Sequence, residues 1–270
     1  MTVCFYLGIH QPSWLATVPE PLFVSHRRLA DRRTLPRRVG IGWKGLISAS
    51  WALDSGGFSE LSMFGEWRTT PAEYVAAVVR YDTEIGHLDW AAPQDWMCEP
   101  QILAKTRLTV AEHQNRTVAN YLELCGRWAA ASDEECPFMP VLQGWTFSDY
   151  HRHADAYQAA GVDLAEQHLV GLGSVCRRQG TGLVGRLVRS LSPWLALHAF
   201  GVKTTGLGQY GAMVETADSM AWSAGGRRVP GCTPSHANEA NCLRYALDWR
   251  TRVIGSIGGA EQFDLFARVS

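Results

Sequence analysis

The feature that most constrains the fold is a repeated alternation of short apolar runs with longer amphipathic segments. Apolar runs of this length are typical of buried strands. They are VCFYLGI (3–9), SASWALD (48–54), HLDWAAP (87–93), FMPVLQG (138–144), QHLVGLG (167–173), WLALHAFG (194–201) and, more loosely, MVETADSM (213–220). Helical patterns separate several of these runs, at 71–86, 109–131, 146–161 and 181–191.

Strand and helix alternating this often predict a parallel sheet, because parallel strands need a crossover connection. Seven or eight such units in a chain of 270 residues fit an α/β fold, a (β/α)8 TIM-like barrel. A doubly wound open sheet is the alternative. We expect one domain over 1–270, with a short C-terminal metal-binding and helical extension at 226–270.

The composition favours a folded protein away from membranes. The chain is 46% hydrophobic and 19% charged, enough for a sizeable core. It contains no apolar stretch long enough to span a membrane, and its first residues lack the basic start and cleavage site of a signal peptide. Seven scattered cysteines fit reduced thiols and a cytoplasmic protein.

Polar residues stand where the apolar runs end. They are Asp54, Asp95, Gln143 with Gly144, Gly171 to Gly173, and Asp218. Active sites of barrels lie at the carboxyl ends of the strands, so these residues should meet at one mouth. A single aspartate at such a position is often only a helix cap or a turn residue, but three with two glycine-rich turns favour a functional site.

Arginines cluster although the net charge is only -1. Residues 25–40 carry three arginine pairs, including Arg32, Arg33, Arg37 and Arg38. The planar guanidinium suits phosphate oxygens, so these four are candidates for nucleic-acid binding. A solvated surface is the plainer alternative.

Five short motifs occur in the order found in one enzyme family. LDSGGF (53–58), PVLQG (140–144), VGLGS (170–174), HAFGVKTTGL (198–207) and ADSMAWS (217–223) resemble segments of the tRNA-guanine transglycosylases. The chain has no room for added RNA-binding domains. It is therefore most similar to the DpdA-type branch, which inserts a 7-deazaguanine into DNA.

The resemblance implies an exchange of guanine for a free 7-deazaguanine base through a covalent aspartyl-glycosyl intermediate. By resemblance Asp218 is the nucleophile and Asp54 the general acid/base. Asp95 would bind the guanine edge, with Asp89 as a rival, and Gln143 would address the base carbonyl. The implied substrate-binding set is Asp95, Gln143, Gly144, Gly173, Ser55, Gly56 and Phe58, with Phe58 packed beneath its loop.

Two further expectations concern the side chains that contact the ring of the base and the metal ligands. The candidates to lie on either side of the flat base are Trp96, Trp145, Met213 and Met220. For the two tryptophans, packing in the core is the alternative. Family members carry a structural zinc held by three cysteines and a histidine. This chain departs from that set and offers Cys232, His236, Glu239 and Cys242, on successive turns of a helix expected over 238–252. The remaining cysteines are expected to be buried thiols.

Other functions stay open at this point. A tRNA-guanine transglycosylase is the nearest alternative. From other classes, a glycoside hydrolase would require sugar-stacking aromatics without arginine clusters, and a nucleic-acid-binding barrel without activity would not require both Asp54 and Asp218. The expected partners are DNA and the free base, with no membrane. A homodimer is one option for the assembly.

Overall fold

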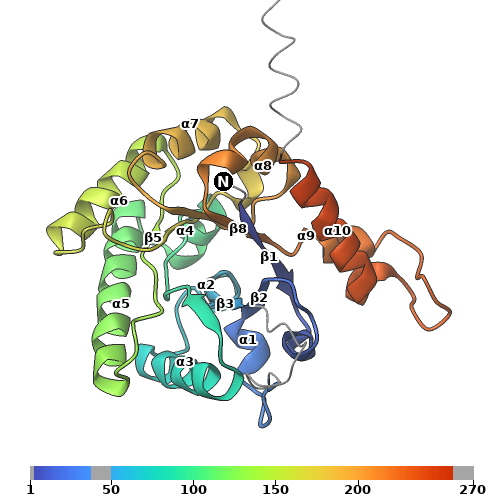
Figure 1. The fold of residues 1–270 in the computed structure, drawn as a ribbon. Helices are drawn as coiled ribbons and strands as arrows, with labels where there is room; N and C mark the ends of the chain where they lie inside the picture. Colours follow the sequence, from blue (N-terminus) through green and yellow to red (C-terminus); the bar gives the residue numbers. More distant parts are fainter. Residues whose placement is uncertain (1–2, 38–49, 258–270) are drawn as a thin grey trace, which may run out of the picture. The chain divides into compact units, whose positions relative to one another are not determined.

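The computed structural model describes residues 3–37 and 50–257 and contains eight strands (Figure 1). Their bounds are β1 Cys4–Ile9, β2 Leu22–Ser25, β3 Trp51–Asp54, β4 Leu88–Ala91, β5 Val141–Leu142, β6 Val170–Leu172, β7 Leu197–Ala199 and β8 Thr216–Ser219. All pairings given for these strands are parallel. Each of the seven predicted runs contains one of these strands. The sequence patterns missed only β2, which is short and follows a proline.

Ten α-helices alternate with the strands within the described residues. They are α1 His26–Leu29, α2 Gly57–Phe64, α3 Pro71–Ile85, α4 Pro100–Thr106, α5 Val110–Ala131, α6 Phe147–Ala159, α7 Gly182–Leu191, α8 Thr204–Tyr210, α9 Ala221–Gly226 and α10 Leu243–Gly255. Short 3-10 turns lie at Pro12–Ala16, Cys176–Arg178, Gly211–Met213 and Glu239–Asn241. Parallel strands alternating with helices confirm the predicted α/β, TIM-like fold class.

Three long helices begin at the residues that the sequence indicates. Thr70, Thr109 and Thr146 each cap a helix in a capping box, in which an acid three residues later bonds back to the cap. Gly161, just beyond α6, adopts φ +83, a left-handed conformation that ends helices. The main helices are therefore specified by local chemistry.

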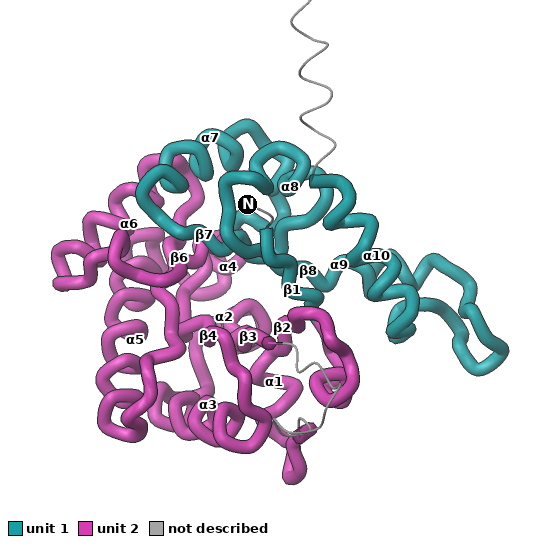
Figure 2. Tube along the Cα trace, viewed as in Figure 1, with its two compact units in different colours: residues 1–8, 175–270 teal, residues 9–174 magenta. Residues whose placement is uncertain are grey.

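The chain forms two compact units (Figure 2). The first combines 1–8 with 175–270, and the second comprises 9–174. In the first unit β8 pairs with β1 on one side and β7 on the other. In the second, β3 pairs with β2 and β4, and β5 pairs with β6. The single domain over 1–270 stays a prediction.

Buried indoles hold each unit internally by hydrogen bonds to distant backbone. In the first unit the Trp222 Nε1–H donates to the carbonyl of Gly8 at 2.8 Å. In the second the Trp51 Nε1–H donates to the carbonyl of Gly86 at 2.8 Å. Both tryptophans are fully buried, so each adds a large apolar area as well as a satisfied polar atom.

The helix expected over 238–252 was placed wrongly at its start. Asn238 caps a single 3-10 turn, and Cys242 has an extended backbone (φ -86, ψ 119) that interrupts any continuous helix. Helix α10 begins only at Leu243. His236, Glu239 and Cys242 therefore lie in the connection before the helix and not on its successive turns.

Candidate active site

The second unit buries a carboxylate against an amide just after two strands that are consecutive along the chain. Asp95 follows β4 and Gln143 follows β5 directly. The Gln143 Nε2–H donates to Asp95 Oδ2 at 2.5 Å. Gln143 is 0% exposed and Asp95 is 9% exposed. Burial raises the pKa of Asp95 to about 7; the Gln143 hydrogen bond lowers it, while the nearby charges of Asp54 and Glu99 raise it further.

A serine and a second acid extend this pair into a network. The Ser174 hydroxyl lies 2.6 Å from Gln143 Oε1 and 3.0 Å from Glu99 Oε2, and it accepts the Cys98 N–H at 2.8 Å. Ser174 has φ 54, an uncommon left-handed conformation for a residue other than glycine. The network fixes both ends of the Gln143 amide, so its orientation is set before any ligand arrives.

The backbone of Gln143 is held as firmly as its side chain. Its N–H donates to His153 Nδ1 at 2.7 Å, and its carbonyl accepts from Gln114 Nε2 at 2.7 Å. A Cβ on Gly173 would lie 2.2 Å from Gln143 Nε2, so only glycine fits there. Gly144 likewise has no room for a side chain, because its Cβ would lie 2.7 Å from that of Asp149. The strand ends thus close tightly around this amide.

The loop that begins with Asp54 requires glycine at position 56. Asp54 ends β3 and is partly exposed. Gly56 has φ +83, and a Cβ there would lie 2.8 Å from the Arg27 side chain. Ser55 is 2% exposed. Phe58 is 44% exposed, so the expectation that it packs beneath the loop was wrong; it stands on the outer side of α2.

Asp218 lies in the first unit, on β8, and is 7% exposed. Its Oδ1 accepts the backbone N–H of Gly201 at 2.8 Å. Gly201 has φ +65, and a Cβ there would lie 2.6 Å from Cys176 Sγ, so this position requires glycine. Within the described residues Oδ1 also lies 3.3 Å from His198 Nε2. The carboxylate is therefore held through one of its two oxygens.

Other candidates are separated by their burial. Asp89 is exposed near the start of β4 and lines a hollow of about 640 Å³, whereas Asp95 is buried. Trp96 packs with Leu61 and Ile102 in a buried cluster, which agrees with core packing. Met213 and Met220 are 40% and 45% exposed, and Trp145 is partly buried.

One comparison with known proteins identifies the family of the chain. The sequence model of the DpdA family, "DeoxyPurine in DNA protein A", matches residues 1–265. The chain belongs to the DpdA family. A search of curated proteins found no significant match. Membership in the DpdA family supports, at the level of the family, a transglycosylase-type enzyme that acts on DNA. It favours this class over a glycoside hydrolase or a binding module without activity.

The four metal candidates of this DpdA family member gather as predicted. Ligand atoms of Cys232, His236, Glu239 and Cys242 all lie within 4.8 Å of one another. Cys232 Sγ is 3.7 Å from Cys242 Sγ and 3.5 Å from His236 Nδ1. Glu239 is 2% exposed; its Oε1 accepts the Cys232 N–H, while its Oε2 has no hydrogen-bond partner within the described residues. The donor set fits a four-coordinate metal ion.

The other cysteines match their prediction only in part. None of the seven cysteines is in a disulfide. Cys98 is buried, whereas Cys4, Cys125 and Cys136 are partly exposed and Cys176 is exposed. No helix of the described residues is both long enough and apolar enough to cross a membrane.

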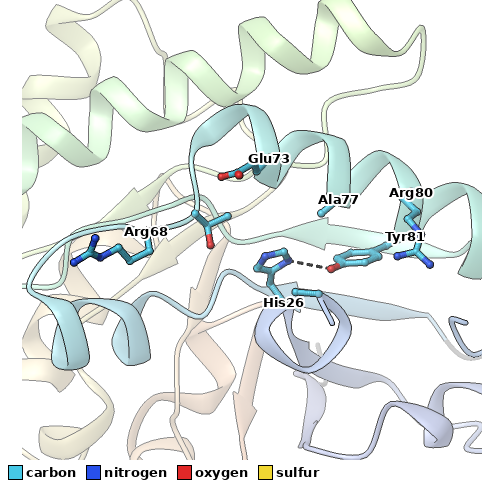
Figure 3. A pocket seen from close by; sticks show the side chains of 8 residues that line it. His26, Arg68, Glu73, Ala77, Arg80 and Tyr81 are labelled. Carbon is cyan, nitrogen blue, oxygen red and sulfur yellow. Dashed lines mark hydrogen bonds between the residues drawn. The ribbon is translucent and has the colours of Figure 1, made fainter. Parts of the chain in front are cut away.

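The arginine segment lies beside a hollow of about 370 Å³ that is lined in part by His26, Arg68 and Arg80 (Figure 3). Arg80 donates to the carbonyls of Arg32 and Arg33 at 3.1 and 3.2 Å and thereby anchors their backbone. The side chains of Arg32, Arg33 and Arg37 are exposed, and no ion pair involves them within residues 3–37 and 50–257. Arg38 lies outside the described residues.

Sequence patterns missed the residues that hold the predicted ones. Ser174 directly follows the VGLG run, Glu99 precedes a proline at the start of α4, and Gln114 sits on a long helix. Each of these positions also suits a plain turn, cap or helix residue. Only Ser174 carried a signal, because it is the first polar residue after a strand end in VGLGS, a motif that resembles a segment of the tRNA-guanine transglycosylases.

Proposed function

We propose that this chain exchanges guanine in DNA for a free 7-deazaguanine such as 7-cyano-7-deazaguanine. The observation that carries the proposal is the buried pair of Asp95 and Gln143 at the strand ends. A purine edge with adjacent N–H groups and a carbonyl needs an acceptor beside a donor, and this pair offers both. The DpdA family match over residues 1–265 supports the same conclusion.

Base recognition begins with the Asp95 carboxylate. Ionised Asp95 accepts from the ring N–H and the exocyclic amine of guanine or a 7-deazaguanine. The Gln143 amide has a second N–H besides the one that it donates to Asp95, and with the backbone of Gly144 and Gly173 it addresses the base carbonyl. Ser55 and Gly56 bring the Asp54 loop to the base, with Phe58 at its outer edge.

The chemical step uses Asp218 as nucleophile. One carboxylate oxygen forms a bond to C1′ of the target nucleotide as the C1′–N9 bond breaks, and the electron pair leaves with guanine. Asp54 gives a proton to the departing base and takes one from N9 of the incoming base. That nitrogen then displaces Asp218 from C1′, which restores the carboxylate.

The DNA partner follows from the site and the arginines. A glycosidic bond inside a duplex is out of reach, so the target nucleotide must be flipped out or already single-stranded. Exposed Arg32, Arg33 and Arg37 contact the phosphates, with Arg38 in the same run. A homodimer stays a prediction. The proposed mechanism does not require one, because a single chain supplies both carboxylates.

The metal cluster holds zinc in this proposal. A tetrahedral zinc with Zn–S bonds of about 2.3 Å places two sulfurs about 3.8 Å apart, close to the 3.7 Å between Cys232 and Cys242. His236 and the unpaired Glu239 Oε2 complete the set. Four protein ligands leave no open position, so zinc would supply stability to the segment before α10 and no chemistry.

The test is incorporation of labelled 7-cyano-7-deazaguanine into duplex DNA or tRNA. We expect label in DNA and release of guanine in equal amount. Asp218→Asn should abolish exchange while DNA binding persists, because the amide keeps the shape of the carboxylate and loses its nucleophilicity. Label in tRNA alone would replace DNA by tRNA as substrate. Normal turnover in Asp218→Asn would remove the nucleophile assignment.

A further inference from the structure

A buried histidine lies beside Asp218 on the neighbouring strand. His198 is on β7, and its side chain is 0% exposed. Its Nε2 lies 3.3 Å from Asp218 Oδ1, the oxygen that also accepts the Gly201 N–H. Phe200 packs edge-on against the imidazole, with ring centroids 4.4 Å apart. The histidine is therefore buried at ion-pair distance from the carboxylate, although its Nε2 makes no aligned hydrogen bond within the described residues.

The other imidazole nitrogen meets a hydroxyl on the strand of Asp218. His198 Nδ1 is 2.8 Å from Thr216 Oγ1, and His198 pairs with Thr216 in the register of β7 and β8. Thr216 and Asp218 are two residues apart on one strand, so their side chains point to the same face. The imidazole thus spans from Thr216 to Asp218.

This arrangement selects one form of the imidazole. Burial lowers the pKa of His198, although the Asp218 charge opposes that effect, so the neutral ring is favoured. A neutral imidazole has one donor and one acceptor nitrogen. If the Thr216 hydroxyl donates to Nδ1, the hydrogen must sit on Nε2, the nitrogen that lies 3.3 Å from Asp218 Oδ1. Tyr6 is another aromatic neighbour of the ring, with centroids 6.5 Å apart.

We propose that His198 is a positioning residue for Asp218, with its tautomer set by Thr216. The backbone N–H of Gly201 donates to Oδ1, and the Nε2–H of His198, which lies 3.3 Å from the same oxygen without hydrogen-bond alignment in this structure, donates to it when the nucleophile acts. Within the described residues no hydrogen bond reaches Oδ2, which is left as the oxygen that attacks C1′. The inference rests on the proposed function, because it assumes that Asp218 is the nucleophile.

Holding one oxygen matters to both halves of the exchange. In the first half, Oδ2 bonds to C1′ while the C1′–N9 electron pair leaves with guanine. The Nε2–H then stays bonded to Oδ1, which becomes the carbonyl oxygen of the ester. In the second half, N9 of the new base displaces Oδ2, and the returning negative charge is shared with Oδ1. Donors already in place reduce the reorganisation that each half requires.

A histidine in a core has a plain structural explanation as well, so the variants must separate the two roles. His198→Gln retains an N–H donor of similar reach, whereas His198→Met has similar length and no donor. Thr216→Val keeps the shape and removes the hydroxyl that sets the tautomer. Thr251→Val, on the exposed side of α10 in the same unit, is the matched control for loss of a threonine hydroxyl.

The measurement is the single-turnover rate of the covalent DNA–protein adduct, formed without free base and resolved under denaturing conditions. DNA affinity and melting temperature are recorded for each variant. We expect His198→Met and Thr216→Val to slow adduct formation about 10- to 100-fold, the scale for a lost hydrogen bond to a charged group. His198→Gln should recover most of that loss, and DNA affinity should not change.

Three other outcomes overturn the inference in distinguishable ways. Normal adduct rates in both His198→Met and Thr216→Val would show that the contact does not position Asp218. Equal slowing by Gln and Met at position 198, in step with a lower melting temperature, would assign His198 a packing role only. A wild-type chain that forms no adduct and incorporates no base would remove the proposed function, and this inference would fall with it.

Discussion

Replacing Asp95 by asparagine should strengthen the fold and abolish base binding at the same time. Asparagine keeps the size of the side chain and an oxygen that accepts the Gln143 N–H. It carries no charge, so it avoids burying an ionised group at a position that is 9% exposed. It also replaces one acceptor by an N–H donor, which opposes the N–H groups of the base edge.

The size of the gain follows from the pKa. Burial raises the pKa of Asp95 from 3.8 to about 7, a difference of about three pH units. At about 1.4 kcal/mol per unit, the ionised form disfavours folding by up to about 4 kcal/mol relative to the protonated form. Between about pH 4 and pH 7 the folded state keeps a proton on Asp95 that the unfolded chain releases. The folded protein therefore has its full stability below about pH 4, and it loses up to about 4 kcal/mol of the free energy of unfolding as the pH rises to about 7. The asparagine variant has no such loss, because its side chain does not ionise.

The assay is urea unfolding of both proteins at a series of pH values between about 4 and 8, with base binding by calorimetry above pH 7. The variant's advantage should be absent near pH 4, grow up to about pH 7 and stay constant above it. Asp89→Asn, on the exposed start of β4, is the matched control and should show no such growth. A gap that does not change with pH, or an asparagine variant that binds the base normally, would refute the reasoning.

Three further changes test the rest of the site. Asp54→Asn should lower the exchange rate about 10²-fold or more, the scale for a lost acid/base group, and a rate within a factor of about two of wild type would reject that role. Arg32→Glu with Arg33→Glu should weaken DNA binding and flatten its salt dependence by about 0.9 per lost phosphate contact, whereas Arg127→Glu, on the exposed side of α5, should not. Elemental analysis of the wild-type protein should find one zinc per chain. Cys242→Ser should lower the melting temperature more than it lowers the rate of the chemical step. A wild-type protein without zinc, together with full activity in Cys242→Ser, would contradict the metal site.

The fold was predictable where local and periodic signals agree. Thr70, Thr109 and Thr146 each stand before an amphipathic stretch with an acid three residues on, and each caps a helix. β2 was missed because four residues, LFVS, carry too little periodicity to stand out. The start of α10 was wrong because Asn238 and Cys242 form a turn whose stability depends on its own caps and not on helical spacing.

The site was predictable where strand ends dictate it. Asp95 and Gln143 were expected to meet because parallel strands end at one edge, and their side chains do hydrogen-bond. Ser174 and Glu99 were not, because a hydroxyl after a glycine turn and an acid before a proline suit ordinary turns equally well. Their roles appear only when the chain brings residues 75 positions apart within 3.0 Å.

In the proposed mechanism, base recognition and bond formation depend on networks that share no residue. Asp95 is held by Gln143 and, through it, by Ser174 in the second unit, whereas Asp218 is held by Gly201 and His198 in the first. Changes in groups without common partners usually add in free energy. Losses in base affinity and in adduct rate should therefore combine as independent factors in double variants. A clear departure from additivity would mean that the bound base itself couples the two carboxylates.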